Sequence, residues 1–432
     1  MFAAGVGKVS RVTIQPGAMD VRRQAGWLPD DQDDLESWLD GHRERVEALG
    51  EQIVLHPVLT ELQELIDTDP VVRMYMNQMI AQVPSTKPYR KRHLESVPQL
   101  VRLINEVLRM APEFSETAMV ATPLAAILDW TMGTPAGFAA FRDPRINAML
   151  KKILTAWCEF LSSGDSRYVL NDSSSGWKCA EAQRTVGMEQ YEHDPQDEHW
   201  GFASWNDFFT RSFKDGARPV ASADDNKVIV SACESTPYGI ATDVKRQDRF
   251  WIKSQPYSLE DMLANDDSVD QFVGGTVYQA FLSATNYHRW HSPVAGTIVR
   301  AFVQEGTYYS EADSEGTDAV EPTNSQSYIA NVAARAIILI EADDPIIGLT
   351  AFVPVGMVEV SSCMIDPKVT PGYHVGKGEE LGYFQYGGST HCLVFRPGTI
   401  AEFTLAAIPQ PHDPDAPLVL VCSKLATANA TV

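Results

Sequence analysis

The chain has little positive charge, few cysteines and no long apolar run. Its 432 residues carry 35 lysines and arginines against 57 aspartates and glutamates, a net charge of −22. Such an excess of negative charge disfavours binding to nucleic acid or anionic lipid. No segment offers the ~20 apolar residues of a transmembrane helix, and the first residues lack the apolar core of a signal peptide. These absences predict a soluble, cytoplasmic protein without a stable membrane anchor.

The six cysteines form no C-x-x-C pair, which predicts reduced thiols and no structural zinc. His288 and His291 have the spacing of half a metal site, but no third cluster of ligands accompanies them. We therefore expect no metal.

Hydrophobic spacing divides the chain into two parts. Apolar residues at helical spacing predict helices over 30–49, 69–84, 100–110 and 144–161. Short β-branched and aromatic runs then predict strands at 228–230, 250–252, 277–282, 296–303, 336–340 and 349–355. We expect an α+β protein, with a helical N-terminal domain over 1–185 and a mostly antiparallel β domain over 186–432.

Residues 387–390 read Gly-Gly-Ser-Thr, for which a surface turn is the simplest interpretation. The alternative is a self-cleavage site, because a hydroxyl next to glycine can approach the preceding carbonyl without a Cβ in the way. Attack by Ser389 on the carbonyl of Gly388 would give an ester. Elimination and hydrolysis would then leave a pyruvoyl group, an electron sink comparable to pyridoxal phosphate.

Two other segments carry candidate catalytic residues. On an extended backbone, His288 and His291 point to different sides, so one suits deprotonation of Ser389 and the other proton transfer during turnover. Glu234 follows an apolar strand and could orient an imidazole. The structural alternatives are core histidines and a surface glutamate, and the adjacent Cys233 fits a buried thiol.

The order of these segments resembles the phosphatidylserine decarboxylase family of pyruvoyl enzymes. The resemblance covers about residues 200–425 and rests on six features in order: Glu234, Y-H-R-W-H-S-P at 287–293, the runs at 331–335 and 352–358, V-x-K-G-E-E-L-G-x-F at 375–384, and G-G-S-T at 387–390.

This resemblance implies a zymogen that cleaves itself between Gly388 and Ser389, giving pieces 1–388 and 389–432. Ser389 becomes the pyruvoyl cofactor, which would bind the substrate as a Schiff base. By the same resemblance, His291 is the base for self-cleavage, Glu234 orients His291, and His288 serves decarboxylation and proton transfer. A homodimer is the usual state of the family.

The resemblance has one departure and one extension. Family members that act on phospholipid generally have Ala-Asp-Gly where this chain has Cys-Glu-Ser at 233–235, which indicates a divergent branch. The N-terminal part is similar to the fungal L-tryptophan decarboxylases of psilocybin biosynthesis. The matching runs are 26–28, 69–72, 136–138, 160–163, 165–167 and 205–209.

Three hypotheses follow. The first is decarboxylation of a soluble, small-molecule amino acid, with aromatic tryptophan, giving tryptamine, as the expected substrate. The second is a phosphatidylserine decarboxylase that makes phosphatidylethanolamine and meets its lipid peripherally. The third is a relative that never cleaves and serves as a binding protein.

Overall fold

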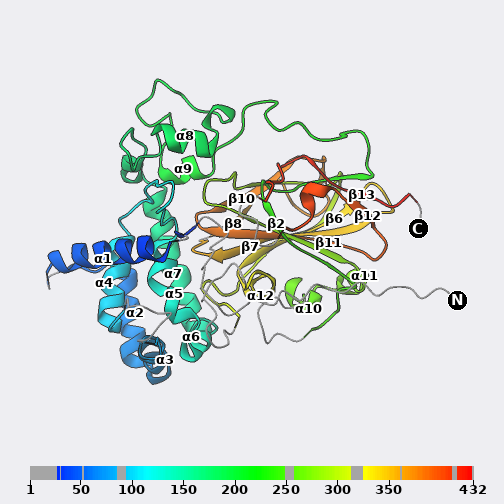
Figure 1. The fold of residues 1–432 in the computed structure, drawn as a ribbon. Coiled ribbons are helices and arrows are strands. Elements are labelled where there is room, and N and C mark those ends of the chain that lie inside the picture. The colour runs from blue at the N-terminus through cyan, green and yellow to red at the C-terminus, as the bar shows by residue number, and fades with distance from the viewer. Residues whose placement is uncertain are drawn as a thin grey trace.

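The computed structural model describes residues 27–29, 31–50, 53–84, 94–248, 257–312, 325–360, 362–410 and 416–430. Helices occupy the first part of the chain and strands most of the rest (Figure 1). All strand pairs in the named sheets are antiparallel. The expected α+β class, with helices before a mostly antiparallel β region, is therefore confirmed.

Capping residues set the helix starts in the first part. Asp69 accepts hydrogen bonds from the N–H groups of Val71 and Val72, and Asp143 caps its helix at Arg145, each with proline next. The helical elements are α1 (Gln32–Ala48), α2 (Pro57–Thr68), α3 (Pro70–Ala81), α4 (Val97–Val107), α5 (Pro123–Met132), α6 (Pro135–Ala140), α7 (Pro144–Leu161), η1 (Gly164–Val169), α8 (Ala180–Val186), η2 (Met188–Gln190) and α9 (Trp205–Phe209).

Three sheets build the second part, in the orders β2-β3-β11-β7-β6-β5-β9, β4-β10-β8 and β1-β13-β12. The strands are β1 (Val228–Val230), β2 (Thr236–Thr242), β3 (Thr276–Leu282), β4 (Arg289–His291), β5 (Gly296–Gln304), β6 (Arg335–Ala342), β7 (Leu349–Val358), β8 (Ser362–Ile365), β9 (His374–Val375), β10 (Glu380–Gln385), β11 (Gly388–Phe395), β12 (Ile400–Phe403) and β13 (Lys424–Ala428). Short helical turns α10 (Leu259–Met262), α11 (Val269–Phe272), α12 (Gln326–Val332) and η4 (Leu405–Ala407) connect them.

The predicted elements match this arrangement in most places. Helices α1, α3, α4 and α7 fall on the four predicted segments, and β1, β3, β5, β6 and β7 fall on predicted strands. The strand predicted at 250–252 lies outside the described residues. The predicted domain boundary at residue 185 falls at the end of α8 and stays a prediction.

The segment 387–390 is not a surface turn. Gly388 pairs with Val358, and Ser389 pairs with Gly356 on β7 and Leu282 on β3. Strand β11 therefore runs between two neighbours, and all of its residues are buried. A strand buried on both faces shows no alternation of polar and apolar residues, which is why the sequence did not predict it.

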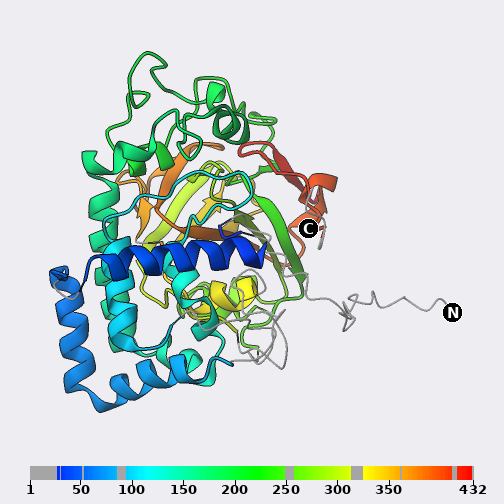
Figure 2. The ribbon, with the colours of Figure 1, turned by 60° about the vertical axis from the view of Figure 1, so that its left-hand side comes forward.

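Strand β11 separates two hydrophobic cores. Cys392 and Val394 pack in the core shared with the helical part, whereas Leu393 and Phe395 pack in the second core. Because side chains alternate along a strand, Ser389 points to the face of the second core. The helical part covers the other face, and Figure 2 shows α1 in dark blue in front of the strands.

Candidate functional site

Ser389 lies at the start of β11 with its hydroxyl buried. Its Oγ has no hydrogen-bond partner among the described residues. Gly387 has a φ of 138°, and a Cβ there would lie 2.4 Å from the carbonyl carbon of Glu359. A Cβ on Gly388 would lie 2.9 Å from Cγ2 of Val358. A side chain at either glycine would therefore crowd the end of β7.

His288 lies in aromatic surroundings. Its ring stacks on Phe209 with centroids 4.0 Å apart and meets the edge of Trp27 at 5.7 Å. Neither ring nitrogen has a hydrogen-bond partner in the described part of the chain. Burial, reinforced by the nearby Arg211 guanidinium, lowers the pKa of His288 well below its ordinary value, and the backbone of Asn286 opposes that shift in part. The imidazole is therefore neutral and its nitrogens are available.

Trp27 connects His288 with the segment around Ser389. Its indole N–H donates to the carbonyl of Leu282 at 2.8 Å, and Leu282 is the β3 residue paired with Ser389. The ring of Trp27 also lies 6.2 Å from that of Tyr386, which precedes the two glycines. These contacts bring His288 and the start of β11 into one neighbourhood, although no direct hydrogen bond joins Ser389 to His288 in the described structure.

His291, on β4, has partners on both ring nitrogens. Nδ1 lies 2.7 Å from the carbonyl oxygen of Gly378, and Nε2 lies 2.9 Å from the hydroxyl of Tyr287. Burial lowers the pKa of His291, and the bond to Gly378 partly opposes that shift. Because a carbonyl can only accept, Nδ1 carries the proton and Nε2 is the basic nitrogen. That tautomer is the one a general base requires.

Glu234 does not make the contact predicted for it. Its carboxylate takes a bidentate ion pair from Arg218, at 2.6 and 2.8 Å, and accepts the N–H of Val421 at 3.2 Å. The planar guanidinium of Arg218 binds both oxygens of the Glu234 carboxylate. The two ring nitrogens of His291 have other partners. The segment acts on His291 through its backbone, since the N–H of His291 donates to the carbonyl of Ala232 at 2.8 Å. Tyr287 and Gly378 orient the ring instead.

Sequence reasoning missed Glu359. Its Oε1 accepts the N–H of Ala125 at 2.8 Å, in the first turn of α5, whereas Oε2 has no partner among the described residues. Burial raises the pKa of this carboxyl well above its ordinary value, and backbone N–H groups of Ala125 and Leu124 oppose that shift in part. Glu359 has a φ of 60° and lies against Gly387. The only signal in the sequence is an acidic residue inside an apolar run.

The described residues contain no group of three histidine, cysteine, aspartate or glutamate side chains placed to hold a metal ion. The same part of the chain contains no helix long and apolar enough to cross a membrane. Cys233 is fully buried, and burial raises the pKa of its thiol well above the ordinary value, which disfavours a nucleophilic role.

Comparison with known proteins covers both parts of the chain. Family models described as phosphatidylserine decarboxylase match residues 56–186 and 205–409. Decarboxylase iboD of Amanita muscaria is 42% identical over 65% of this chain and 85% of its own length. An L-tryptophan decarboxylase of Psilocybe cyanescens is 34% identical over 88% of this chain and 90% of its own.

A phosphatidylserine decarboxylase proenzyme of Chlamydia trachomatis is more distant, 32% identical over 59% of this chain and 75% of its own length. The matches span the helical part, both histidines and the segment that contains Ser389. The chain therefore belongs to the phosphatidylserine decarboxylase family, a family of pyruvoyl-dependent carboxy-lyases.

Proposed function

We propose that the protein is a pyruvoyl-dependent decarboxylase of a soluble aromatic amino acid, converting L-tryptophan to tryptamine, and that it matures by cleaving itself between Gly388 and Ser389. The observation that carries the proposal is the buried Oγ of Ser389, which has no hydrogen-bond partner among the described residues and directly follows two glycines at which a Cβ would crowd the end of β7. The relatives named L-tryptophan decarboxylase support the aromatic substrate.

Maturation begins when His291 takes the hydroxyl proton of Ser389, directly or through Tyr287, whose hydroxyl contacts its Nε2. Oγ attacks the carbonyl carbon of Gly388, the C–N bond breaks, and the proton passes to the amine, which gives an ester. Loss of the α-proton of residue 389 and departure of the ester oxygen leave a free carboxylate on Gly388 and a dehydroalanine at position 389. Water replaces the nitrogen of dehydroalanine, ammonia leaves, and a ketone remains.

For turnover, the ketone supplies an electron sink that makes loss of CO₂ from an amino acid feasible. We assign the proton transfer to His288 because its imidazole is neutral and has no side-chain partner among the residues that the structure describes. Phe209 and Trp27 keep water away from this imidazole, which favours protonation of the substrate carbon by one defined group.

Denaturing mass spectrometry of the purified protein tests maturation. We expect two pieces that divide between residues 388 and 389, the smaller with a pyruvoyl N-terminus, and a single full-length chain for Ser389→Ala. A wild-type chain that stays whole through long incubation supports the non-enzymatic alternative and overturns the proposal. Cleavage that persists in Ser389→Ala would show that the site is elsewhere.

Release of CO₂ tests the substrate. We expect release from free L-tryptophan and none from phosphatidylserine vesicles. The family relatives named phosphatidylserine decarboxylase make the lipid the alternative, and release from vesicles alone would establish it.

A further inference from the structure

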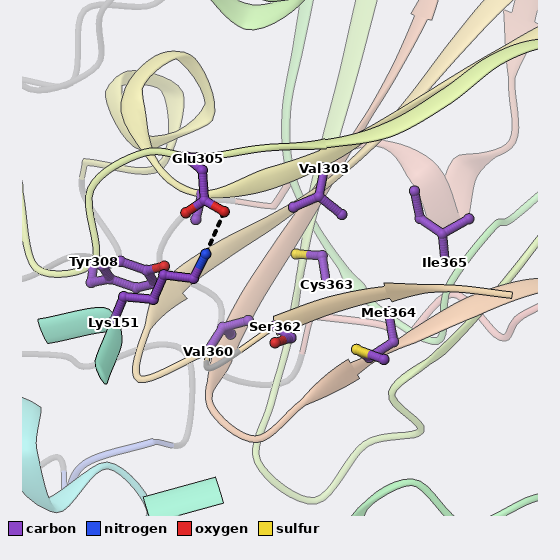
Figure 3. Close-up of a pocket in the computed structure, with 10 residues that line it drawn as sticks. Lys151, Val303, Glu305, Tyr308, Val360, Ser362, Cys363, Met364 and Ile365 are labelled. Carbon is purple, nitrogen blue, oxygen red and sulfur yellow. Dashed lines mark hydrogen bonds and ion pairs between the residues drawn. The ribbon is translucent and has the colours of Figure 1, made fainter. Parts of the chain in front are cut away.

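A cavity of about 340 Å³ opens between the helical part and the second core (Figure 3). Val303, Tyr308, Ala334 and Val360 contribute to its walls, and Lys151 and Glu305 form an ion pair across one side. Lys151 comes from α7 and Glu305 follows β5, so both parts of the chain build this cavity. None of these residues has a role in the maturation chemistry.

The register of the sheet brings the cavity to the same end as Ser389. Ser389 pairs with Gly356 on β7, and the N–H of Gly356 donates to the carbonyl of Ala334 at 3.0 Å. Ala334 lines the cavity. Because neighbouring strands lie about 4.8 Å apart, Ala334 is separated from Ser389 by roughly 10 Å across the sheet.

The cavity also lies on the face to which Ser389 points. Residues paired across antiparallel strands have their side chains on the same face of the sheet. A side chain at Gly356 would therefore lie on the same face as the hydroxyl of Ser389. A Cβ there would lie 2.9 Å from Cβ of Val360. Val360 lines the cavity and belongs to the second core. Val360 therefore borders both the cavity and the strand position beside Ser389.

The walls suit a flat apolar group. Tyr308 offers an aromatic ring, and Met364 offers a thioether, a partner that sulfur–aromatic contacts favour. The volume is near the lower end of the ~300–1,000 Å³ found for small-molecule sites. This size fits the side chain of one amino acid and is small for the two acyl chains of a phospholipid.

We propose that this cavity holds the aromatic side chain of the substrate and that Val303 and Val360 set the size of ring accepted. The proposal rests on the proposed function, since it assigns the cavity to the amino acid whose carboxylate leaves at position 389. The Lys151–Glu305 ion pair closes one side of the site and ties α7 to it.

Val303→Phe tests the assignment, with Val299→Phe as its matched control. Both valines lie on β5 and are similarly exposed, 45% and 42%, but Val299 does not line the cavity. We expect both variants to mature, and only Val303→Phe to raise KM for L-tryptophan, by about ten-fold or more, because a phenyl ring fills the space of the substrate ring. Equal KM values for the two variants would overturn the assignment.

Equilibrium dialysis of L-tryptophan against Ser389→Ala separates this assignment from the proposed function, because this variant forms no ketone. Adding Val303→Phe to that background should weaken binding by about ten-fold, and adding Val299→Phe should not. If the wild type releases no CO₂ but the dialysis result holds, the function fails and the cavity assignment stands. Absence of binding, or equal binding in both double variants, would overturn the assignment even if the enzyme is active.

Discussion

The two histidines of the Y-H-R-W-H segment lie in opposite kinds of surroundings. His291 is held at both nitrogens, by Tyr287 and Gly378, and at its backbone by Ala232. His288 packs against the rings of Phe209 and Trp27, and its imidazole has no side-chain hydrogen-bond partner among the described residues. A fixed tautomer suits a single, oriented proton abstraction, whereas free nitrogens suit repeated exchange of a proton with a substrate. The difference supports separate roles in maturation and turnover.

The largest expected effect is on maturation. His291→Ala removes the proposed base, so we expect the chain to stay whole in denaturing mass spectrometry while the wild type cleaves. His374→Ala is the control, because His374 is exposed and pairs with Asp343, away from Ser389 in the sheet order. Normal cleavage of His291→Ala would remove the distinction between the histidines.

His288→Ala should mature normally but turn over slowly. We expect kcat to fall by about 10²–10⁴-fold, the range for loss of a general acid or base, with KM changed little. Stopped assays on fully cleaved protein measure this. If His288→Ala also fails to cleave, the two histidines do not have separate roles.

Arg218→Met should destabilise the region that holds the His291 backbone. The variant leaves the buried carboxylate of Glu234 without its partner, which costs about 3–5 kcal/mol. Urea unfolding of the uncleaved Ser389→Ala chain measures the free energy. Arg246→Met, which breaks exposed ion pairs with Asp270 and Glu260, is the control and should change stability much less. Equal losses of unfolding free energy in the two variants would contradict a larger contribution from the buried ion pair.

Both histidines make stability dependent on pH. Their pKa values are lowered in the folded chain, so they stay neutral there, while the unfolded chain binds protons below its ordinary pKa of 6.5. Above pH 6.5 both histidines are neutral in the folded and the unfolded chain, so they do not change the free energy of unfolding. Below pH 6.5 the free energy of unfolding falls as pH drops, with a slope approaching about 1.4 kcal/mol per pH unit for each histidine. Unfolding of Ser389→Ala at several pH values should show a smaller slope when His288→Leu is added. An unchanged slope would mean that His288 is protonated in the folded chain.

The smallest effect is expected for Tyr287→Phe. This variant removes one hydrogen bond to Nε2 of His291, worth about 1 kcal/mol, and leaves the bond to Gly378 in place. Time courses of cleavage should change by several-fold at most. A complete block would make Tyr287 a required proton carrier and not only a positioning residue.

The sequence predicted what local patterns encode. Helices α3 and α7 could be placed because an aspartate and a proline mark their starts. Helix α5 could not, because all its residues are buried and no polar face reveals the helical period.

The same limit applies to the site. Motif order indicated Ser389 and the two histidines, but the partner of Glu234 is Arg218, sixteen positions earlier in the chain, and no local pattern joins them. The contact between Glu359 and Ala125 spans 234 positions and depends on how the two parts of the chain pack.

The position of β11 bears on how the protein would refold after cleavage. A cut before Ser389 severs the chain at the first residues of a strand whose ladders to β3 and β7 remain whole from Ser389 to Phe395. The smaller piece would then persist as an inserted strand, together with β12 and β13, which pairs with β1. Only before the cut is β11 covalently joined to the strands between which it inserts. After denaturation, two separate pieces would have to find each other by diffusion, so we expect the cleaved protein to refold less readily than the uncleaved chain.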